Sequence, residues 1–307
     1  MLWILLAILL AGAAWGLHYG YKTAFYYDDP RKSPYEYGNN EQILRCKEVL
    51  DAAIEKYDAA SCEAVSITSH DGLTLTGKYY HIADGAPLEI YCHGYKGNAI
   101  RDFCGFWPVA KELGHNVLLI DQRSHGDSQG HTISFGILEK QDVQNWVRWA
   151  EKRFGPVNMA LCGVSMGAAT VLMASGMDLP EQVKGIWADC GFSSAEEVLR
   201  HTIRMRRMPE KAAFWATRFG GKVFGGLDFR EYSALDGVKQ AKIPILLIHG
   251  EADAMVPCEM AHALKEACAA PVTLLTVPGA PHGICFYVDN AAYCAAVEKL
   301  VEDALNA

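Results

Sequence analysis

The sequence predicts an α/β fold, in which an eight-stranded, mostly parallel sheet is covered by helices on both faces. From residue 88 onward, short apolar runs alternate with longer segments of helical composition, which is typical of a parallel sheet with crossover helices. The apolar runs are nearly continuous, as at residues 117–120 (VLLI) and 245–248 (ILLI), and strands buried on both faces have this composition. The length of 307 residues, half of them hydrophobic, is sufficient for one large domain with a full core.

An N-terminal apolar segment predicts a transmembrane anchor over residues 1–21. Residues 2–17 carry no charge, and at about 1.5 Å per residue the segment can nearly cross a hydrocarbon core of about 30 Å. Trp3 and Trp15 stand where interfacial aromatic residues occur in membrane helices. A cleaved signal peptide with a small-residue site at residues 11–13 is the competing interpretation, although no lysine or arginine precedes the apolar run. A buried helix of a soluble domain is the third and least favoured.

Residues 22–60 are predicted to form a polar linker followed by a peripheral helix. Residues 28–40 contain two prolines and a Gly-Asn-Asn sequence, which is typical of a linker, and residues 41–57 have a helical pattern. Three basic residues follow the apolar segment: Lys22, Arg31 and Lys32. By the positive-inside rule they favour the cytoplasmic face of the membrane for the main domain.

The main domain is predicted over residues 61–307. It begins with an antiparallel hairpin of residues 63–68 and 73–82, joined by the turn at Asp71 and Gly72. Six more strands are predicted, in chain order: 88–92, 116–120, 157–162, 184–189, 243–249 and 272–277. Helices are predicted around 99–113, around 137–154, directly after residue 165, from about 257 and over 284–305. In such a sheet, ligands bind beyond the carboxyl ends of the strands.

The alternation stops between residues 191 and 241, which predicts a helical cap insertion over residues 192–241. About fifty residues separate two core strands here, where a crossover needs far fewer. The first part is rich in arginine: Arg200, Arg204, Arg206 and Arg207. The second part is rich in aromatic residues: Phe214, Trp215, Phe219 and Phe224. Two interpretations stay open: a solvated basic helix followed by a core-packing helix, or a cap whose aromatic residues line an acyl pocket and whose arginines face lipid headgroups.

The sequence Gly-Val-Ser-Met-Gly at residues 163–167 predicts a nucleophile elbow centred on Ser165. Glycines two residues on either side of the serine allow a sharp strand-to-helix turn, which exposes the hydroxyl at a helix N-terminus. The pattern alone is common in proteins. An apolar run before it, a helical segment after it and two partners downstream strengthen the prediction.

A serine hydroxyl needs a base to accept its proton, and the base needs a third group to fix its tautomer. Asp253 follows the strand at 243–249 and His282 follows the strand at 272–277, so the order along the chain is Ser165, Asp253, His282. We predict these residues as the catalytic triad. Two other carboxylates stay open for the acid role: Glu251 and Asp189. Three other histidines precede a glycine and are predicted to hydrogen-bond within their loops: His93, His125 and His249.

Two backbone N–H groups are predicted to hold the oxyanion that forms when a serine attacks an acyl carbon. Met166 follows the nucleophile at the helix N-terminus, and Tyr95 lies in the glycine-containing loop at residues 93–98. Glycines let this loop approach a substrate closely. For Tyr95, a purely packing role and a contribution from its hydroxyl both stay open.

Five segments together resemble the α/β-hydrolase superfamily, and most of all its serine-aminopeptidase-like and Bem46-like bacterial members: HGYKGN at 93–98, DQRSHGDS at 121–128, GVSMG at 163–167, HGEAD at 249–253 and PHG at 281–283. The resemblance covers about residue 63 to the C-terminus. It implies a Ser-Asp-His hydrolase with no metal and no organic cofactor. Ser124 stands where many relatives have a glycine, which affects the shape of that loop and not the triad.

The sequence therefore predicts a serine hydrolase of carboxylic esters that acts on a small or lipid-like acyl substrate and is held at a membrane by its N-terminal helix. A serine peptidase of the aminopeptidase type or a thioesterase is the alternative among enzymes, and a catalytically silent binding protein is the alternative outside them. The net charge of −8 argues against a nucleic-acid-binding protein, which needs a basic surface. The ten cysteines include no C-x-x-C pair and are predicted to be mostly free thiols.

Overall fold

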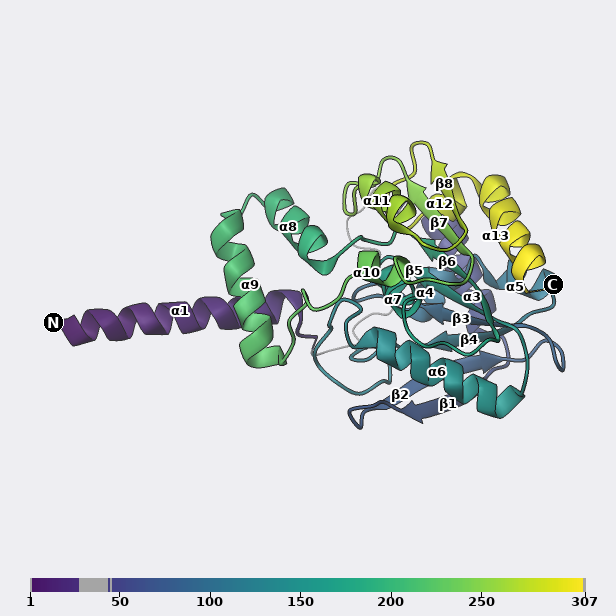
Figure 1. Ribbon diagram of the computed structural model, residues 1–307, viewed down its shortest axis with the longest axis horizontal. Coiled ribbons are helices and arrows are strands. Elements are labelled where there is room, and N and C mark those ends of the chain that lie inside the picture. The colour runs from purple at the N-terminus through teal and green to yellow at the C-terminus, as the bar shows by residue number, and fades with distance from the viewer. Residues whose placement is uncertain (1, 28–43, 45, 306–307) are drawn as a thin grey trace.

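The computed structural model describes residues 2–27, 44 and 46–305, and its centre is one eight-stranded sheet (Figure 1). The helices and strands are, in chain order, α1 Leu2–Ala24, α3 Lys47–Asp58, β1 Glu63–Thr68, β2 Thr74–Tyr80, β3 Leu88–Cys92, α4 Ala99–Phe103, α5 Trp107–Glu112, β4 Asn116–Ile120, α6 Glu139–Phe154, β5 Met159–Val164, α7 Met166–Ala174, β6 Val183–Asp189, α8 Ala195–Met205, α9 Glu210–Gly225, α10 Ala234–Val238, β7 Ile245–Gly250, α11 Glu259–Ala267, β8 Val272–Val277, α12 Cys285–Val288 and α13 Asn290–Ala304. The predicted linker at 28–40 lies outside the described residues, as does most of the first turn of the helix predicted at 41–57.

The strand order in the sheet is β1-β2-β4-β3-β5-β6-β7-β8. β2 pairs antiparallel with both of its neighbours, as the predicted hairpin requires on one side. Every other pair of adjacent strands is parallel. The predicted fold class is confirmed, and the strands begin and end within two residues of their predicted positions. The carboxyl ends of β3, β5, β6, β7 and β8 consequently meet at one edge of the sheet.

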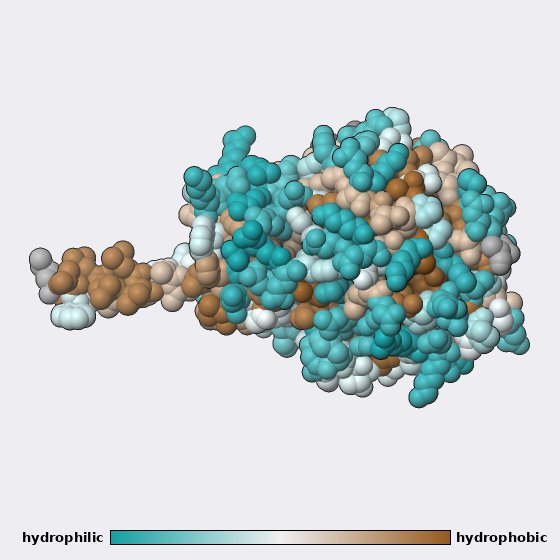
Figure 2. All heavy atoms as spheres, in the orientation of Figure 1, coloured by the Kyte–Doolittle hydropathy of each residue, from teal (hydrophilic) through white to brown (hydrophobic). Residues whose placement is uncertain are grey.

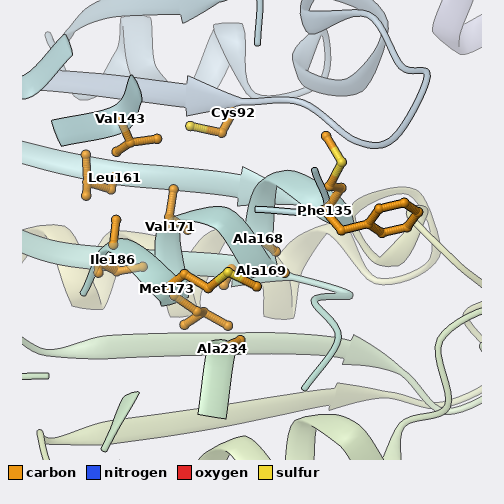
Figure 3. Packing of buried hydrophobic residues seen from close by; sticks show 14 of the residues in the cluster. Cys92, Phe135, Val143, Leu161, Ala168, Ala169, Val171, Met173, Ile186 and Ala234 are labelled. Carbon is orange, nitrogen blue, oxygen red and sulfur yellow. The ribbon is translucent and has the colours of Figure 1, made fainter. Parts of the chain in front are cut away.

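Helices cover both faces of the sheet and enclose two hydrophobic clusters. One cluster lies beneath α6, α7 and α11, and Figure 3 shows Val171 of α7 packed near Leu161 and Ile186 of the strands and Val143 of α6. The other cluster lies beneath α3, α4 and α13. All residues of α7 are buried, which explains why this helix has no polar face in the sequence.

Two predicted helices are each broken into two. The helix predicted at 99–113 forms α4 and α5, because Pro108 lacks an N–H and fits only in the first turn of a helix. The helix predicted at 284–305 forms α12 and α13. Here the carboxylate of Asp289 accepts a hydrogen bond from the N–H of Ala292 at 3.0 Å and caps the second helix.

Helix α1 is long and apolar enough to cross a membrane, judged by its length and composition. Its N-terminal part projects from the body of the molecule as an apolar rod (Figures 1 and 2). Its C-terminal part packs against α9, where the two backbones approach closely at Gly20 and Gly220. A Cβ atom on Gly220 would lie 2.1 Å from the carbonyl oxygen of Leu17, so this crossing requires a glycine. The helix continues to Ala24, beyond the predicted end of the anchor at residue 21.

The segment predicted as a cap contains α8, α9 and α10. Phe214 of α9 is buried against Phe229, whereas Trp215 stacks on Phe219 and is 56% exposed. Arg200 of α8 forms ion pairs with Glu196 and Glu210, and Arg204 pairs with Glu210 as well. These contacts give Phe214 a core-packing role and show that two of the four arginines are ion-paired within the insertion.

Candidate active site

Ser165 lies in a strained turn between β5 and α7. Its φ of 56° is uncommon for a residue other than glycine, and its N–H donates a hydrogen bond to the carbonyl of Asp189 at 2.8 Å. A Cβ atom on Gly167 would lie 1.8 Å from the carbonyl oxygen of Cys92 in β3, and one on Gly163 would lie 2.4 Å from the carbonyl carbon of Gly167. The two flanking glycines therefore allow α7 to start directly against β3, and this packing holds the serine outward.

The structure brings Ser165, Asp253 and His282 together, although 117 positions separate the first from the last. The Nε2 atom of His282 lies 2.8 Å from Oγ of Ser165, and its Nδ1 atom lies 2.7 Å from Oδ2 of Asp253. With the proton on Nδ1, the imidazole donates to the carboxylate and accepts from the serine hydroxyl. The imidazole is 17% exposed, so it is open to a substrate, whereas the carboxylate is fully buried.

The environment of Asp253 keeps its side chain ionised. Burial raises the pKa of this carboxyl, but hydrogen bonds from His249 and His282 lower it more, and the net pKa is well below its usual range. Its Oδ1 atom accepts hydrogen bonds from the N–H groups of Met255 and Val256, each at 2.8 Å. The Nε2–H group of His249, at the end of β7, donates to the carbonyl of Val256 in the following loop at 2.8 Å.

The two alternative carboxylates are placed elsewhere. Glu251 is exposed and accepts a hydrogen bond from the hydroxyl of Thr276 at 2.8 Å. Asp189 is buried behind the triad at the end of β6, and its Oδ1 atom has no hydrogen-bond partner among the described residues. Burial raises the pKa of Asp189 from the ordinary 3.8 to about 6.

Replacement of Asp189 by asparagine should leave turnover nearly unchanged and should stabilise the protein relative to wild type as the pH rises. The unfolded chain loses this proton above pH 3.8 and the folded chain only above about pH 6, so the wild type loses stability as the pH rises through that window. At about 1.4 kcal/mol per pH unit the loss reaches about 3 kcal/mol. Urea unfolding of wild type and Asp189→Asn at pH 4 and pH 8 measures this loss. If the two proteins differed in free energy of unfolding by the same amount at both pH values, the raised pKa of Asp189 would be contradicted.

The loop after β3 lies against the serine from the other side. A Cβ atom on Gly94 would be 3.3 Å from Cβ of Ser165, so the two backbones are close. The N–H of Gly94 donates to Oδ2 of Asp102 at 2.8 Å, and the N–H of Lys96 donates to Nε2 of His125 at 3.0 Å. Within the described part of the chain the N–H of Tyr95 has no acceptor. The N–H of Met166, the first residue of α7, has no intrahelical partner.

A cavity of about 210 Å³ opens beside Ser165 and His282. Its other lining residues are mostly apolar, with one ion pair: Leu50, Gly94, Tyr95, Arg101, Asp102, Val164, Met255, Gly283, Ile284 and Tyr287. The four aromatic residues of α9 that the sequence offered as an acyl pocket do not line it. Leu50 and Tyr287 were missed by sequence reasoning, since they come from α3 and α12 and carry no motif. A larger hollow of about 760 Å³ lies away from the triad, around His81 and Arg153.

One group of side chains in the described part of the chain has the residue types and proximity of a metal site. The ligand atoms of Cys190, Asp253 and His282 lie within 4.8 Å of one another. Asp253 and His282 already hydrogen-bond each other, and burial raises the pKa of the Cys190 thiol well above its usual value, which disfavours the thiolate that binds metals. The donor set therefore fits a hydrogen-bonded triad better than a metal centre. All ten cysteines lie in the described residues and are unpaired.

Comparisons with known proteins identify the family to which this fold belongs. A family model described as "Alpha/beta hydrolase family" matches residues 90–297. Uncharacterized protein YqkD of Bacillus subtilis is 28% identical over 81% of this chain and 82% of its own length. The lysophosphatidylserine lipase ABHD12 of Danio rerio is 26% identical over 59% of this chain and 47% of its own. The structure of the Pyrococcus furiosus esterase Pf2001 superposes with a TM-score of 0.66 at 22% identity, over 81% of this chain and 95% of that one.

Proposed function

Because this chain belongs to the alpha/beta hydrolase family, we propose that it is a serine hydrolase that cleaves carboxylic esters with Ser165, Asp253 and His282. The observation that carries the proposal is the unbroken line of hydrogen bonds from Oγ of Ser165 through the imidazole to the buried carboxylate. A serine at a nucleophile elbow, a base within hydrogen-bond distance and an ionised third group are the requirements of this chemistry.

The reaction follows from these positions. Oγ of Ser165 attacks the acyl carbon while Nε2 of His282 takes the hydroxyl proton, and the Asp253 carboxylate stabilises the imidazolium. The N–H groups of Met166 and Tyr95 hold the oxyanion of the tetrahedral intermediate. Nε2 returns the proton to the departing alkoxide, which leaves an acyl-enzyme. A water molecule, deprotonated by His282, attacks this acyl-enzyme and releases the carboxylic acid and the free serine.

The lining of the cavity favours an ester over a peptide with a free amino group. An aminopeptidase needs a carboxylate to meet the ammonium group of its substrate, and Asp102 is the one carboxylate among the described lining residues apart from the triad. Its two oxygens are already engaged, one with the guanidinium of Arg101 at 2.8 Å and the other with the N–H of Gly94 at 2.8 Å. The small, largely apolar cavity suits a short acyl chain or the first carbons of a longer one.

The domain organisation that we propose is an anchor at residues 1–21, a linker and peripheral helix at 22–60 and a hydrolase domain at 61–307 with its cap at 192–241. The exposed apolar surface of α1 from Leu2 to Trp15 suits a membrane span. The packing of the C-terminal part of α1 against α9 supports an anchor that stays with the domain. Because α9 crosses α1 where α1 meets the body, a membrane that contains α1 would lie next to α9 and its exposed Trp215 and Phe224.

A substrate panel tests the proposed function on the full-length protein in washed membranes and after extraction in detergent. We expect hydrolysis of p-nitrophenyl esters with short acyl chains, weaker hydrolysis of matched thioesters and none of aminoacyl p-nitroanilides. We also expect the activity to stay in the membrane pellet after an alkaline carbonate wash. A preference for the aminoacyl substrate would contradict the ester assignment, and release of the activity by carbonate would contradict the anchor.

A further inference from the structure

The side chain of Tyr95 extends from the loop beside Ser165 to the last turn of α1. Its hydroxyl donates a hydrogen bond to the carbonyl of Ala24 at 2.9 Å and lies 3.4 Å from that of Thr23. The last carbonyl groups of a helix have no partner within the helix, and the negative end of the helix dipole attracts a hydrogen-bond donor. The hydroxyl of Tyr95 therefore caps α1. Burial raises the pKa of Tyr95 to about 12, which keeps the hydroxyl protonated as a donor.

The aromatic ring of Tyr95 is held by packing as well. It stacks on Phe135 with 5.1 Å between ring centroids, and Phe135 meets the ring of Phe25 edge-on at 5.7 Å. Phe25 directly follows α1 and is fully buried. The ring thus lies between the loop beside the serine and the residues that follow the helix, so Tyr95 has little freedom to change its rotamer.

The end of α1 is fixed to the domain independently of Tyr95. The carbonyl of Phe25 accepts a hydrogen bond from the N–H of Ile133 at 2.7 Å, and Tyr26 forms a β-bridge with Thr132. The hydroxyl of Tyr21 lies 2.8 Å from Oγ1 of Thr132. Loss of the Tyr95 hydroxyl should therefore leave α1 in place and release only the loop.

The same loop is held on its other sides. The N–H of Gly94 is bound by Asp102, and the N–H of Lys96 is bound by His125. Lys96 has a φ of 49°, a backbone conformation that is uncommon for residues other than glycine and that the surrounding contacts must stabilise. The orientation of the Tyr95 N–H thus depends on the contacts of Gly94 and Lys96 and on the side chain of Tyr95, whose hydroxyl connects the loop to α1.

We propose that Tyr95 is a positioning residue: its hydroxyl, held by the C-terminal end of α1, fixes the direction of its own backbone N–H toward the oxyanion. The anchor helix is then part of the active site's support and not only a tether. This inference rests on the proposed function, since it assigns a role in the same reaction. It links the placement of α1 to the stabilisation of the transition state.

The test is Tyr95→Phe in the full-length protein in detergent, which removes the hydroxyl and keeps the ring. Because complete loss of an oxyanion donor costs about 10²- to 10³-fold in kcat, a loosened donor is expected to cost about tenfold, with KM changed less than about twofold. Binding of a short alkyl boronic acid, which forms a tetrahedral adduct on the serine, should weaken by a similar factor. Binding of the carboxylate product, which forms no such adduct, should change little.

Tyr21→Phe is the matched control, because its hydroxyl joins the same helix to Thr132 and does not contact the loop. An unchanged kcat in Tyr95→Phe, or an equal loss in Tyr21→Phe, would overturn the inference and leave the proposed function standing. If the wild type neither hydrolyses esters nor reacts with a fluorophosphonate, both fail together. If Tyr95→Phe does not fold, 4-aminophenylalanine and 4-fluorophenylalanine at position 95 keep the ring, with and without a hydrogen-bond donor toward Ala24, and equal kcat values in these two variants would overturn the inference.

Discussion

Replacement of Ser165 by alanine is expected to lower kcat for ester hydrolysis by about 10⁶-fold and to abolish labelling by a fluorophosphonate. The substitution removes only the hydroxyl group, whose Oγ atom forms the bond to the acyl group in the covalent intermediate. Little folding energy should be lost, because the turn is held by the backbone bond from Ser165 N–H to Asp189 and by the contact of Gly167 with β3. Initial rates with a p-nitrophenyl ester, together with a thermal unfolding curve, measure both effects.

Ser175→Ala is the control for this substitution. Ser175 follows the last residue of α7, is buried, and donates its hydroxyl hydrogen bond to the carbonyl of Leu172 at 2.6 Å. It should lose stability by about 1 kcal/mol and keep wild-type kcat. Turnover in Ser165→Ala within tenfold of the wild type would show that another residue is the nucleophile.

Replacement of Asp253 by asparagine is expected to lower kcat by about 10⁴-fold. The amide oxygen should take the position of Oδ1, which accepts the N–H groups of Met255 and Val256. The amide nitrogen then faces Nδ1 of His282 and forces the imidazole proton onto Nε2. A protonated Nε2 cannot accept the proton of the serine hydroxyl. The negative charge that stabilises the imidazolium is lost as well.

Glu251→Gln is the matched control for the acid role, since Glu251 lies two residues away along the same loop and bonds Thr276 instead. It should retain wild-type kcat. The pH dependence of kcat in both variants separates a catalytic effect from a folding effect. A loss of less than tenfold in Asp253→Asn, with a large loss in Asp189→Asn, would move the acid role to Asp189.

The sheet and the convergence of Ser165, Asp253 and His282 could be predicted because both follow from local patterns and one topological rule. Continuous apolar runs identify strands buried on both faces, as β4 and β7 are. Residues that follow parallel strands meet at the same sheet edge, so Ser165, Asp253 and His282 could be expected together from their positions after β5, β7 and β8. The two predicted helices that break at Pro108 and Asp289 show where local composition alone was insufficient.

The features of the site that could not be predicted depend on contacts between elements that are distant in the sequence. Leu50 reaches the cavity only because α3 packs beside α4, and no motif marks it. The hydroxyl of Tyr95 finds Ala24 because α1 ends beside the loop after β3, a crossing that the glycines at positions 20 and 220 permit. The aromatic composition of α9 is also typical of a pocket lining. The positions of its aromatic residues on the helix instead place Phe214 in the core and Trp215 at the surface.

The most direct measurement is to identify the residue that carries the acyl group during turnover. The full-length enzyme is mixed with a p-nitrophenyl ester, quenched in acid within the first turnover and digested for mass spectrometry. We predict one acyl group per chain, located on Ser165 and absent when Asp253 and His282 have been allowed to complete deacylation. Ester cleavage at the normal rate with the acyl group on another residue, such as the neighbouring thiol of Cys190, would contradict the account.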